Sequence, residues 1–209
     1  DFPKSCGCHP SPNLGSVHIQ RVAGSEAKPS VCMCVHTIFL WVRYVRLPPH
    51  FSWFFPSKEL VTKIGDLIIQ KDLSFVSVGC GRGYFELLIF LYLKEQGVEN
   101  PETRIMASDL QTTHMSEDGV TFYPWIKVQD GLQTVEEANE CFGKDYLLFF
   151  AWVPTDGLFA EYAIQQSLAN YVAVVGESEG GCTGTDRFNI LVGRGDDGFE
   201  HGDVEFKLL

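Results

Sequence analysis

The chain lacks an apolar run long enough to cross a membrane. The apolar stretch from Val31 to Val45 contains His36 and Arg43, and it is shorter than the ~20 residues that a membrane span requires. It also lies too far from the first residue, Asp1, to be the apolar part of a signal peptide. We therefore expect no membrane association, and an upstream targeting segment stays an open question.

Basic residues are also scarce. The sequence has 16 Lys and Arg against 27 Asp and Glu, a net charge of −11. Residues 1–50 carry +3 and residues 51–209 carry −14, so the larger part of the chain is strongly acidic. Phosphate backbones are bound by clusters of Lys and Arg. This charge balance therefore disfavours a nucleic-acid partner, and a small molecule or a protein is the expected partner.

The cysteines do not form an even set. Seven cysteines exclude a secreted framework in which every cysteine is paired, and a reducing cytoplasmic location is the simplest expectation. Two Cys-x-Cys pairs lie near the start, each with a histidine beside it. Zinc knuckles usually space their cysteines by two or more residues, so we predict no metal. The alternative is a zinc site formed by Cys6, Cys8, Cys32 and Cys34.

Composition divides the chain into an arm and one domain. Gly, Pro and Ser recur through the first part of residues 1–50, which predicts a poorly ordered N-terminal arm. Residues 51–209 are long enough for one globular domain with a sizeable core. Their first predicted helix is capped by Ser57 and carries apolar residues at helical spacing.

The most informative segment runs from Phe75 to Glu86. An apolar strand leads into Gly79-Cys80-Gly81-Arg82-Gly83, and the residues from Tyr84 to Gln96 are mostly strong helix formers. Glycines at such a turn allow positive φ and a close approach of a ligand to the backbone, and the helix that follows offers unpaired N–H groups.

The spacing of the glycines favours one class of ligand over another. A dinucleotide fold has a third glycine where this chain has Tyr84, which disfavours a nicotinamide-dependent oxidoreductase. The strand from Thr103 to Ser108 ends at Asp109, about as far downstream as the ribose-binding acid of such folds. G-x-G-x-G followed by this acid resembles the first motif of the class I S-adenosylmethionine-dependent methyltransferases. That resemblance covers roughly residues 57–193.

The rest of the chain predicts alternating strands and helices, hence an α/β fold with a doubly wound, mostly parallel sheet and helices on both faces. An antiparallel C-terminal hairpin, as in that family, is expected from two short apolar segments. The expected strands are Val120–Val128, Tyr146–Ala151, Tyr171–Val175, Asn189–Val192 and Val204–Leu208; the expected helices are a short one opened by a capping box at Thr134 and Glu137 and ending at Gly143, and Leu158–Ala169.

The resemblance implies a set of cofactor contacts. The turn would approach the methionine part of S-adenosylmethionine, Asp109 the ribose and Asp130 the adenine amino group. Two departures from the family pattern stand out: Ser77 replaces an acid two places before the first glycine, and the segment after Asp109 is short for a crossover helix. The cofactor-binding residues are thus predicted to be Gly79, Cys80, Gly81, Gly83, Asp109 and Asp130.

The acceptor side is predicted from the ends of the next two strands. Trp152 and Thr155 follow one strand, and Glu177 begins a glycine-rich loop after the other. The sequence contains neither Asn-Pro-Pro-Tyr nor a visible triad, and methyl transfer from a sulfonium depends mainly on alignment and exclusion of water. The expected function is methyl transfer to a small molecule or protein side chain. The alternative is a non-catalytic binding or scaffold protein with the same fold.

Overall fold

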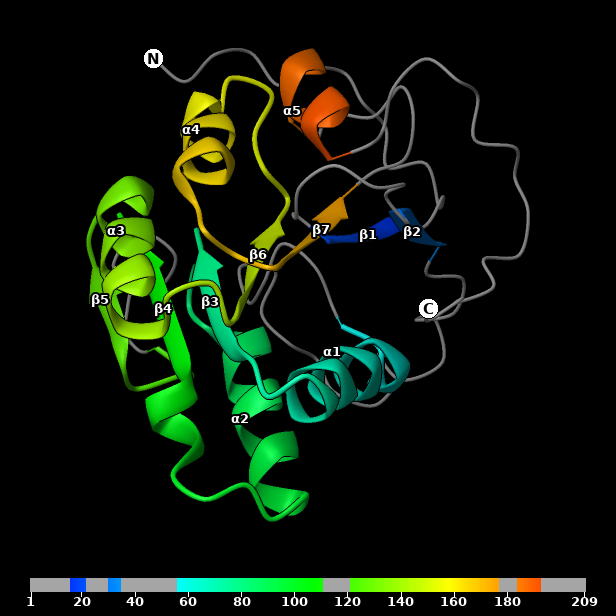
Figure 1. The fold of residues 1–209 in the computed structure, drawn as a ribbon, viewed down its shortest axis with the longest axis vertical. Coiled ribbons are helices and arrows are strands. Elements are labelled where there is room, and N and C mark those ends of the chain that lie inside the picture. The colour runs from blue at the N-terminus through cyan, green and yellow to red at the C-terminus, as the bar shows by residue number, and fades with distance from the viewer. Residues whose placement is uncertain (1–15, 22–29, 35–55, 111–120, 177–183, 193–209) are drawn as a thin grey trace.

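The computed structural model describes residues 16–21, 30–34, 56–110, 121–176 and 184–192; for the first two ranges only the backbone is described. These residues form one sheet of seven strands with helices packed on both faces (Figure 1).

The five strands at one side of the sheet are all parallel to their neighbours, which confirms the expected α/β class. Two further strands extend the sheet in antiparallel fashion beyond the last of them. The strands, in their order across the sheet, are β2 (Ser30–Cys34), β1 (Ser16–Arg21), β7 (Tyr171–Gly176), β6 (Tyr146–Ala151), β3 (Ser74–Val78), β4 (Ile105–Asp109) and β5 (Ile126–Val128).

The connections reverse direction beside β3. From β3 the chain moves outward to β4 and β5, then returns to the other side of β3 as β6 and continues to β7. The neighbouring carboxyl ends of β3 and β6 therefore flank the point where strand order reverses, the usual ligand position in open α/β sheets. The helices are α1 (Lys58–Gln70), α2 (Tyr84–Glu95), the 3₁₀ turn η1 (Pro101–Arg104), α3 (Gly131–Phe142), α4 (Leu158–Gln166) and α5 (Asp186–Leu191).

Two apolar layers hold the helices to the sheet. Along β6, Leu147 and Phe149 face α1 and α2, whereas Leu148 and Phe150 face α3, α4 and α5. Because successive side chains of a strand point to opposite faces, a strand covered on both sides must be apolar throughout. The continuous run from Tyr146 to Ala151 has this pattern, and the sequence prediction of a buried parallel strand there is confirmed.

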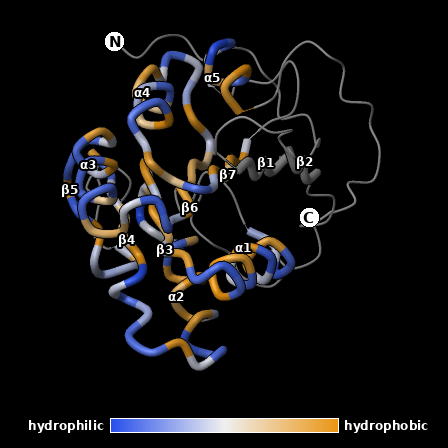
Figure 2. Tube along the Cα trace, in the orientation of Figure 1, coloured by the Kyte–Doolittle hydropathy of each residue, from blue (hydrophilic) through white to orange (hydrophobic). Residues whose placement is uncertain are grey.

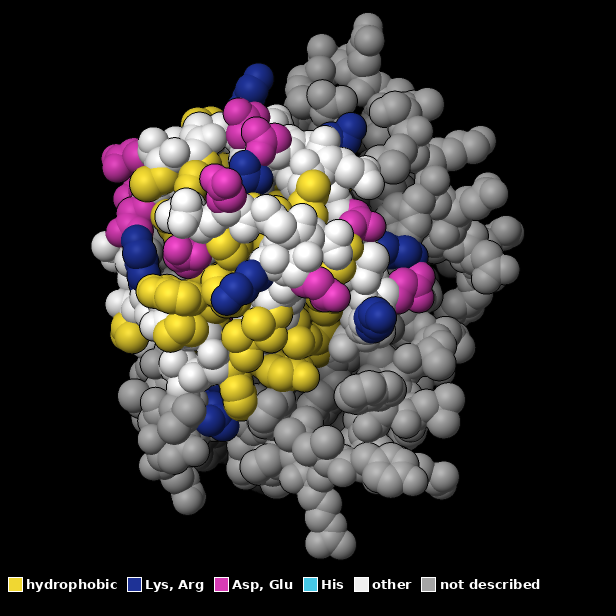
Figure 3. Space-filling view, turned by 90° about the horizontal axis from the view of Figure 1, so that it is seen from below, with side chains coloured by type: hydrophobic (Ala, Val, Ile, Leu, Met, Phe, Trp, Pro, Cys, Tyr) yellow, Lys and Arg dark blue, Asp and Glu magenta, His cyan; other side chains and the backbone are white. Residues whose placement is uncertain are grey.

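Helix α2 is apolar on almost every side, as its colouring in Figure 2 shows. Ile89 packs toward the sheet, Tyr92 contacts α1 at Gly65, and Phe90 meets the ring of Trp125 before β5. Three different neighbours thus account for three apolar faces. Leu91 remains half exposed. The face drawn in Figure 3 shows apolar side chains bordered by charged ones.

Three local predictions were wrong. The helix α3 begins at Gly131 and is capped by Asp130, so Thr134 lies within it and opens no capping box. Residues 189–192 do not form a strand, because Thr185 caps α5 and its helix continues to Leu191. The strand expected from Val120 to Val128 is limited to β5, since the residues before Ile126 turn. The strand expected at 204–208 lies outside the described residues.

The antiparallel part of the sheet is at the N-terminal end of the chain. β1 pairs with β7 over six residue pairs, from Ser16 opposite Gly176 to Arg21 opposite Tyr171, and β2 pairs with β1. Both strands lie within the region predicted to be an arm, and the boundary at residue 51 stays a prediction. Among the residues described, no helix is both long and apolar enough to span a bilayer.

Gly83→Ala should destabilise the protein more than Gly97→Ala. Both glycines have a similar φ, 74° and 80°, so both substitutions carry the strain of a left-handed alanine, about 1 kcal/mol. A Cβ on Gly83 would also lie 2.5 Å from Ile126 Cδ1 and 2.8 Å from Tyr123 Cβ, whereas one on Gly97 meets nothing within 4 Å. Overpacking should add about 1–3 kcal/mol. Urea unfolding measures the difference, and equal losses would contradict this packing.

Candidate functional site

The turn after β3 has the backbone conformation that its glycines were expected to provide. Gly79, Gly81 and Gly83 have φ values of 73°, 57° and 74°, a region that side chains with a Cβ rarely adopt. The N–H groups of Gly79 and Cys80 donate to the Ser108 carbonyl oxygen at 2.9 and 3.0 Å. The turn is therefore fastened to the neighbouring strand β4 while it leads into α2.

Asp109 ends β4 and reaches the same turn. Its Oδ2 atom accepts a hydrogen bond of 2.9 Å from the Gly81 N–H. The prediction that the glycines and Asp109 lie at one edge of the sheet is thereby confirmed. A charged acceptor at a backbone N–H makes a stronger hydrogen bond than a neutral one. The role proposed for Asp109 toward a ribose stays a prediction.

A buried acid lies directly beneath the turn. The Ser77 hydroxyl donates a 2.5 Å hydrogen bond to Glu86 Oε1, joining β3 to the first turn of α2. Glu86 Oε2 is also buried and has no hydrogen-bond partner among the described residues. Burial raises the pKa of Glu86 to about 7; the hydrogen bond from Ser77 opposes this effect, and the charge of Asp109 adds to it.

Sequence reasoning treated Glu86 only as a helix former. The signal that would have found it is positional: Glu86, Ile89 and Leu93 are three and four residues apart, so they share the face of α2 that packs on the sheet. An acid on a buried helix face is uncommon, and its burial is costly unless a hydrogen-bond partner is present. Ser77, noted as a departure from the family pattern, is that partner.

Cys80 shares the acidic surroundings of this pair. Burial raises the pKa of its thiol well above the ordinary value, and the charges of Glu86 and Asp109 raise it further. The thiol is therefore protonated at neutral pH and a poor nucleophile.

An aromatic segment before β5 packs on the outer side of the turn. The Phe122 N–H donates to the Arg82 carbonyl oxygen at 2.7 Å, and the Arg82 guanidinium lies 4.7 Å from the centre of the Phe122 ring. Tyr123 is fully buried, and its hydroxyl has no partner among the described residues. Burial, with the charges of Glu102 and Glu86, raises the Tyr123 pKa above its usual range.

Asp130 has a structural task at the start of α3. Its Oδ1 atom accepts hydrogen bonds from the N–H groups of Leu132 and Gln133, at 2.7 and 3.1 Å. These bonds satisfy two of the donors that a helix start leaves unpaired. Asp130 is exposed at the carboxyl edge of the sheet, and its predicted contact with adenine is a second role that stays a prediction.

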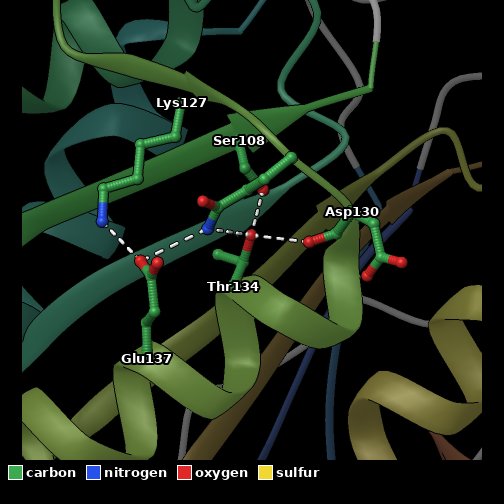
Figure 4. Close-up of polar contacts among 6 residues, drawn as sticks. Ser108, Lys127, Asp130, Thr134 and Glu137 are labelled. Atoms are coloured by element: carbon green, nitrogen blue, oxygen red, sulfur yellow. Dashed lines mark hydrogen bonds and ion pairs between the residues drawn. The ribbon is translucent and has the colours of Figure 1, made fainter.

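A chain of polar contacts joins β4 and β5 to α3, as Figure 4 shows. Within α3, the Thr134 hydroxyl lies 2.6 Å from Ser108 Oγ and donates to the Asp130 carbonyl oxygen at 2.9 Å. Glu137 pairs with Lys127, and the hydrogen bond from that lysine lowers the pKa of the carboxyl. The ends of the strands that carry Asp109 and Asp130 are therefore held in register with the helix.

Phe159 is a further residue at this edge that sequence reasoning did not single out. Cβ atoms built on Gly131 and Gly157 would lie 3.3 and 3.2 Å from its ring, and one built on Gly79 would lie 4.0 Å away. The ring is thus placed among three glycines, of which Gly79 is a predicted cofactor contact and Gly131 directly follows another, Asp130. The signal in the sequence was an aromatic residue in the first turn of α4, close to Gly157.

The predicted acceptor side is described in part. Trp152 directly follows β6 and has a φ of 55°, which is unusual for a bulky residue and marks it as a functional candidate. Its N–H donates to the Val175 carbonyl oxygen at 2.7 Å, and its side chain packs on the apolar cluster that also contacts Cys80. Thr155 is exposed in the next turn, and Glu177 lies outside the described residues.

The zinc alternative remains a prediction. Cys6 and Cys8 lie outside the described residues, and for Cys32 and Cys34 only the backbone of β2 is described. In the described residues, no group of three or more His, Cys, Asp or Glu is arranged to hold a metal ion.

Comparisons with protein-family models, with curated proteins and with solved structures found no match to this chain.

Glu86→Gln should remove a pH dependence of stability. Between the ordinary pKa of 4.5 and the raised value of about 7, folded Glu86 holds a proton that the unfolded chain lacks. This group therefore makes stability fall by up to about 3 kcal/mol as pH rises through that window, with little change above it. The variant should show a flatter profile in urea unfolding at pH 5, 6, 7 and 8.

The matched control is Glu95→Gln, which removes the same charge from the exposed end of the same helix. Its free energy of unfolding should depend on pH in the same way as that of the unsubstituted protein. If Glu86→Gln also kept this dependence, the raised pKa of Glu86 would be contradicted.

Proposed function

We propose that this chain binds S-adenosylmethionine and transfers its methyl group to a small molecule or a protein side chain, as a class I methyltransferase-like protein. One observation carries the proposal. The turn from Gly79 to Gly83 is anchored to Asp109 beside the point where strand order reverses. Ligands of open α/β sheets bind there.

The residues at this edge fit the cofactor. Gly79 is exposed, and a Cβ built on it would meet no atom nearer than Phe159 Cζ at 4.0 Å, so a ligand can approach its backbone. Gly81 and Gly83 would hold the methionine part with the turn, and the carboxylate of Asp109 would accept the ribose hydroxyls. Asp130 would face the adenine. The assignment of this α/β fold to the class I methyltransferase-like type rests on these proposed contacts as well.

The cofactor supplies an electrophilic methyl group on a sulfonium. The chain's own contribution is to orient the acceptor in line with it and to exclude water. Trp152, beside β3 at the end of β6, would form a wall of the acceptor pocket, and Thr155 would lie near its rim. A base is needed only for an acceptor that is a poor nucleophile at neutral pH.

Binding without methyl transfer is the second candidate. It is favoured by Ser77, which stands where the family pattern has an acid and whose hydroxyl donates to Glu86. Trp152 and Thr155, the acceptor-side candidates within the described residues, are also not ionisable at neutral pH. Methylation of an acceptor separates the two candidates, whereas cofactor affinity does not.

Titration calorimetry with S-adenosylmethionine and S-adenosylhomocysteine tests the cofactor site, with NAD as a negative control. We expect micromolar binding of both sulfur compounds. Asp109→Asn keeps an acceptor for the Gly81 N–H but loses one carboxylate oxygen, so it should weaken binding by about 1–3 kcal/mol, or roughly 5- to 150-fold. Asp109→Ala should weaken binding at least as much and also loosen the turn.

Asp72→Asn is the matched control. Asp72 lies before β3, at the opposite edge of the sheet, and asparagine tolerates its positive φ of 52°. Its affinity should equal that of the unsubstituted protein. If a folded sample bound neither sulfur compound, the proposal would be overturned.

A further inference from the structure

The glycine turn lies between a carboxylate and an aromatic ring. On the side of α1 and α2, Asp109 accepts a hydrogen bond of 2.9 Å from the Gly81 N–H. On the side of α3 and α4, a Cβ built on Gly79 would meet no atom nearer than Phe159 Cζ, at 4.0 Å. Phe159 lies in the first turn of α4 and packs on the apolar layer that includes Val78. A ligand over the turn would therefore meet a polar group on one side and an apolar ring on the other.

The ring of Phe159 meets its glycine neighbours with its edge. A Cβ on Gly131 would lie 3.3 Å from Cδ2, and one on Gly157 would lie 3.2 Å from Cε1, the carbon on the opposite side of the ring. At Gly131 no second ring atom comes closer than 3.9 Å, and at Gly79 Cζ alone comes within 4.0 Å. A contact with the face of the ring would bring neighbouring ring carbons almost equally close. Because Phe159 is also only partly buried, its ring is held in place without using up its faces.

The position of the ring selects one part of the cofactor. Asp130, whose carboxylate caps α3 at the exposed edge of the sheet, directly precedes Gly131. A phenyl ring offers no hydrogen bond to the charged methionine part of S-adenosylmethionine, whereas flat bases stack on aromatic side chains. Adenine combines such a flat ring with an amino group that a carboxylate can accept.

We propose that Phe159 binds the adenine of the cofactor through its ring and thereby makes this site selective for a nucleoside with a flat aromatic base. The inference rests on the proposed function, which places the ligand over the turn. Asp109 and Asp130 would fix the polar groups of the nucleoside, and Phe159 supplies the apolar contact that neither carboxylate can make. No covalent bond changes.

Calorimetry with S-adenosylhomocysteine and 5′-methylthioadenosine tests the contact. The two compounds share the base and the ribose, but the second lacks the amino-acid part. Phe159→Ala should weaken both by the same factor, roughly 5- to 150-fold, because both lose the same stacking contact. Phe159→Leu keeps most of the apolar volume but not the flat ring, so it should still weaken both roughly 2- to 10-fold. A role in packing alone would be restored by leucine.

The matched control is Phe142→Ala. Phe142 is another partly buried phenylalanine on the same apolar layer, but it ends α3, where its ring lies 6.5 Å from that of Tyr146 at the start of β6. This variant should lose stability in urea unfolding, as Phe159→Ala does, and keep both affinities. Circular dichroism checks that each variant is folded under the conditions of the titration.

Nuclear magnetic resonance reports the contact directly. In the complex with S-adenosylhomocysteine, the ring protons of Phe159, assigned by comparison with Phe159→Leu, should show nuclear Overhauser effects to the carbon-bound protons of adenine. A ring that only supports the sheet edge from below would show none.

The outcomes separate the two proposals. If the folded protein binds neither S-adenosylmethionine, S-adenosylhomocysteine nor 5′-methylthioadenosine, both proposals fall. If only 5′-methylthioadenosine binds, the proposed function falls and the affinity of Phe159→Ala for that compound decides the role of the ring. If all bind, and Phe159→Ala binds them unchanged or more tightly, or weakens S-adenosylhomocysteine alone, the cofactor site stands and the role of Phe159 is overturned.

Discussion

The hydrogen bond from the Gly81 N–H to Asp109 Oδ2 is the constraint on which this edge of the sheet depends. It joins the turn after β3 to the end of β4, and the Ser108 carbonyl oxygen reinforces it by accepting from Gly79 and Cys80. The turn can adopt this path only because its three glycines take positive φ, and the one at Gly83 also leaves room for Ile126 and Tyr123. Backbone conformation, strand pairing and side-chain packing therefore all fix the position of this turn. A ligand would meet a preformed surface there rather than a loop that has to be ordered on binding.

The same attachment of the turn to β4 brings two acidic side chains close together. Asp109 approaches the turn from above, and Glu86 lies beneath it on α2, held by Ser77 at 2.5 Å. Burying a carboxyl so close to another acid disfavours its charged form, and the raised pKa of Glu86 is the result. An apolar residue at position 86 would continue the packing of Ile89 and Leu93 without that cost.

Local patterns predicted the part of this arrangement that depends on neighbours in sequence. The strand, glycine turn and helix from 74 to 95 could be read directly, and the position of Asp109 followed from the parallel pairing of β3 with β4. Glu86 was missed although its spacing from Ile89 and Leu93 places it on the face of α2 that packs on the sheet. The cap of α3 is Asp130 and not the predicted box at Thr134, because the Asp130 side chain reaches two N–H groups. The segment 189–192 is too short for periodicity to distinguish strand from helix, and the cap at Thr185 decided it. The pairing of β1 with β7 joins segments about 150 residues apart in the chain, beyond the reach of any local pattern.

The two faces of the sheet have different tasks at this edge, and Ser108 lies where they meet. Its carbonyl oxygen holds the turn, while its hydroxyl contacts Thr134 on the opposite helix layer at 2.6 Å. The next residue, Asp109, points to the layer of α1 and α2, where Ser77 and Glu86 also lie. One layer therefore carries Glu86 and Asp109, and the other supports the strand ends through Thr134, Gln129 and the ion pair of Lys127 with Glu137. A ligand at the turn would therefore meet a backbone that is held from both faces of the sheet.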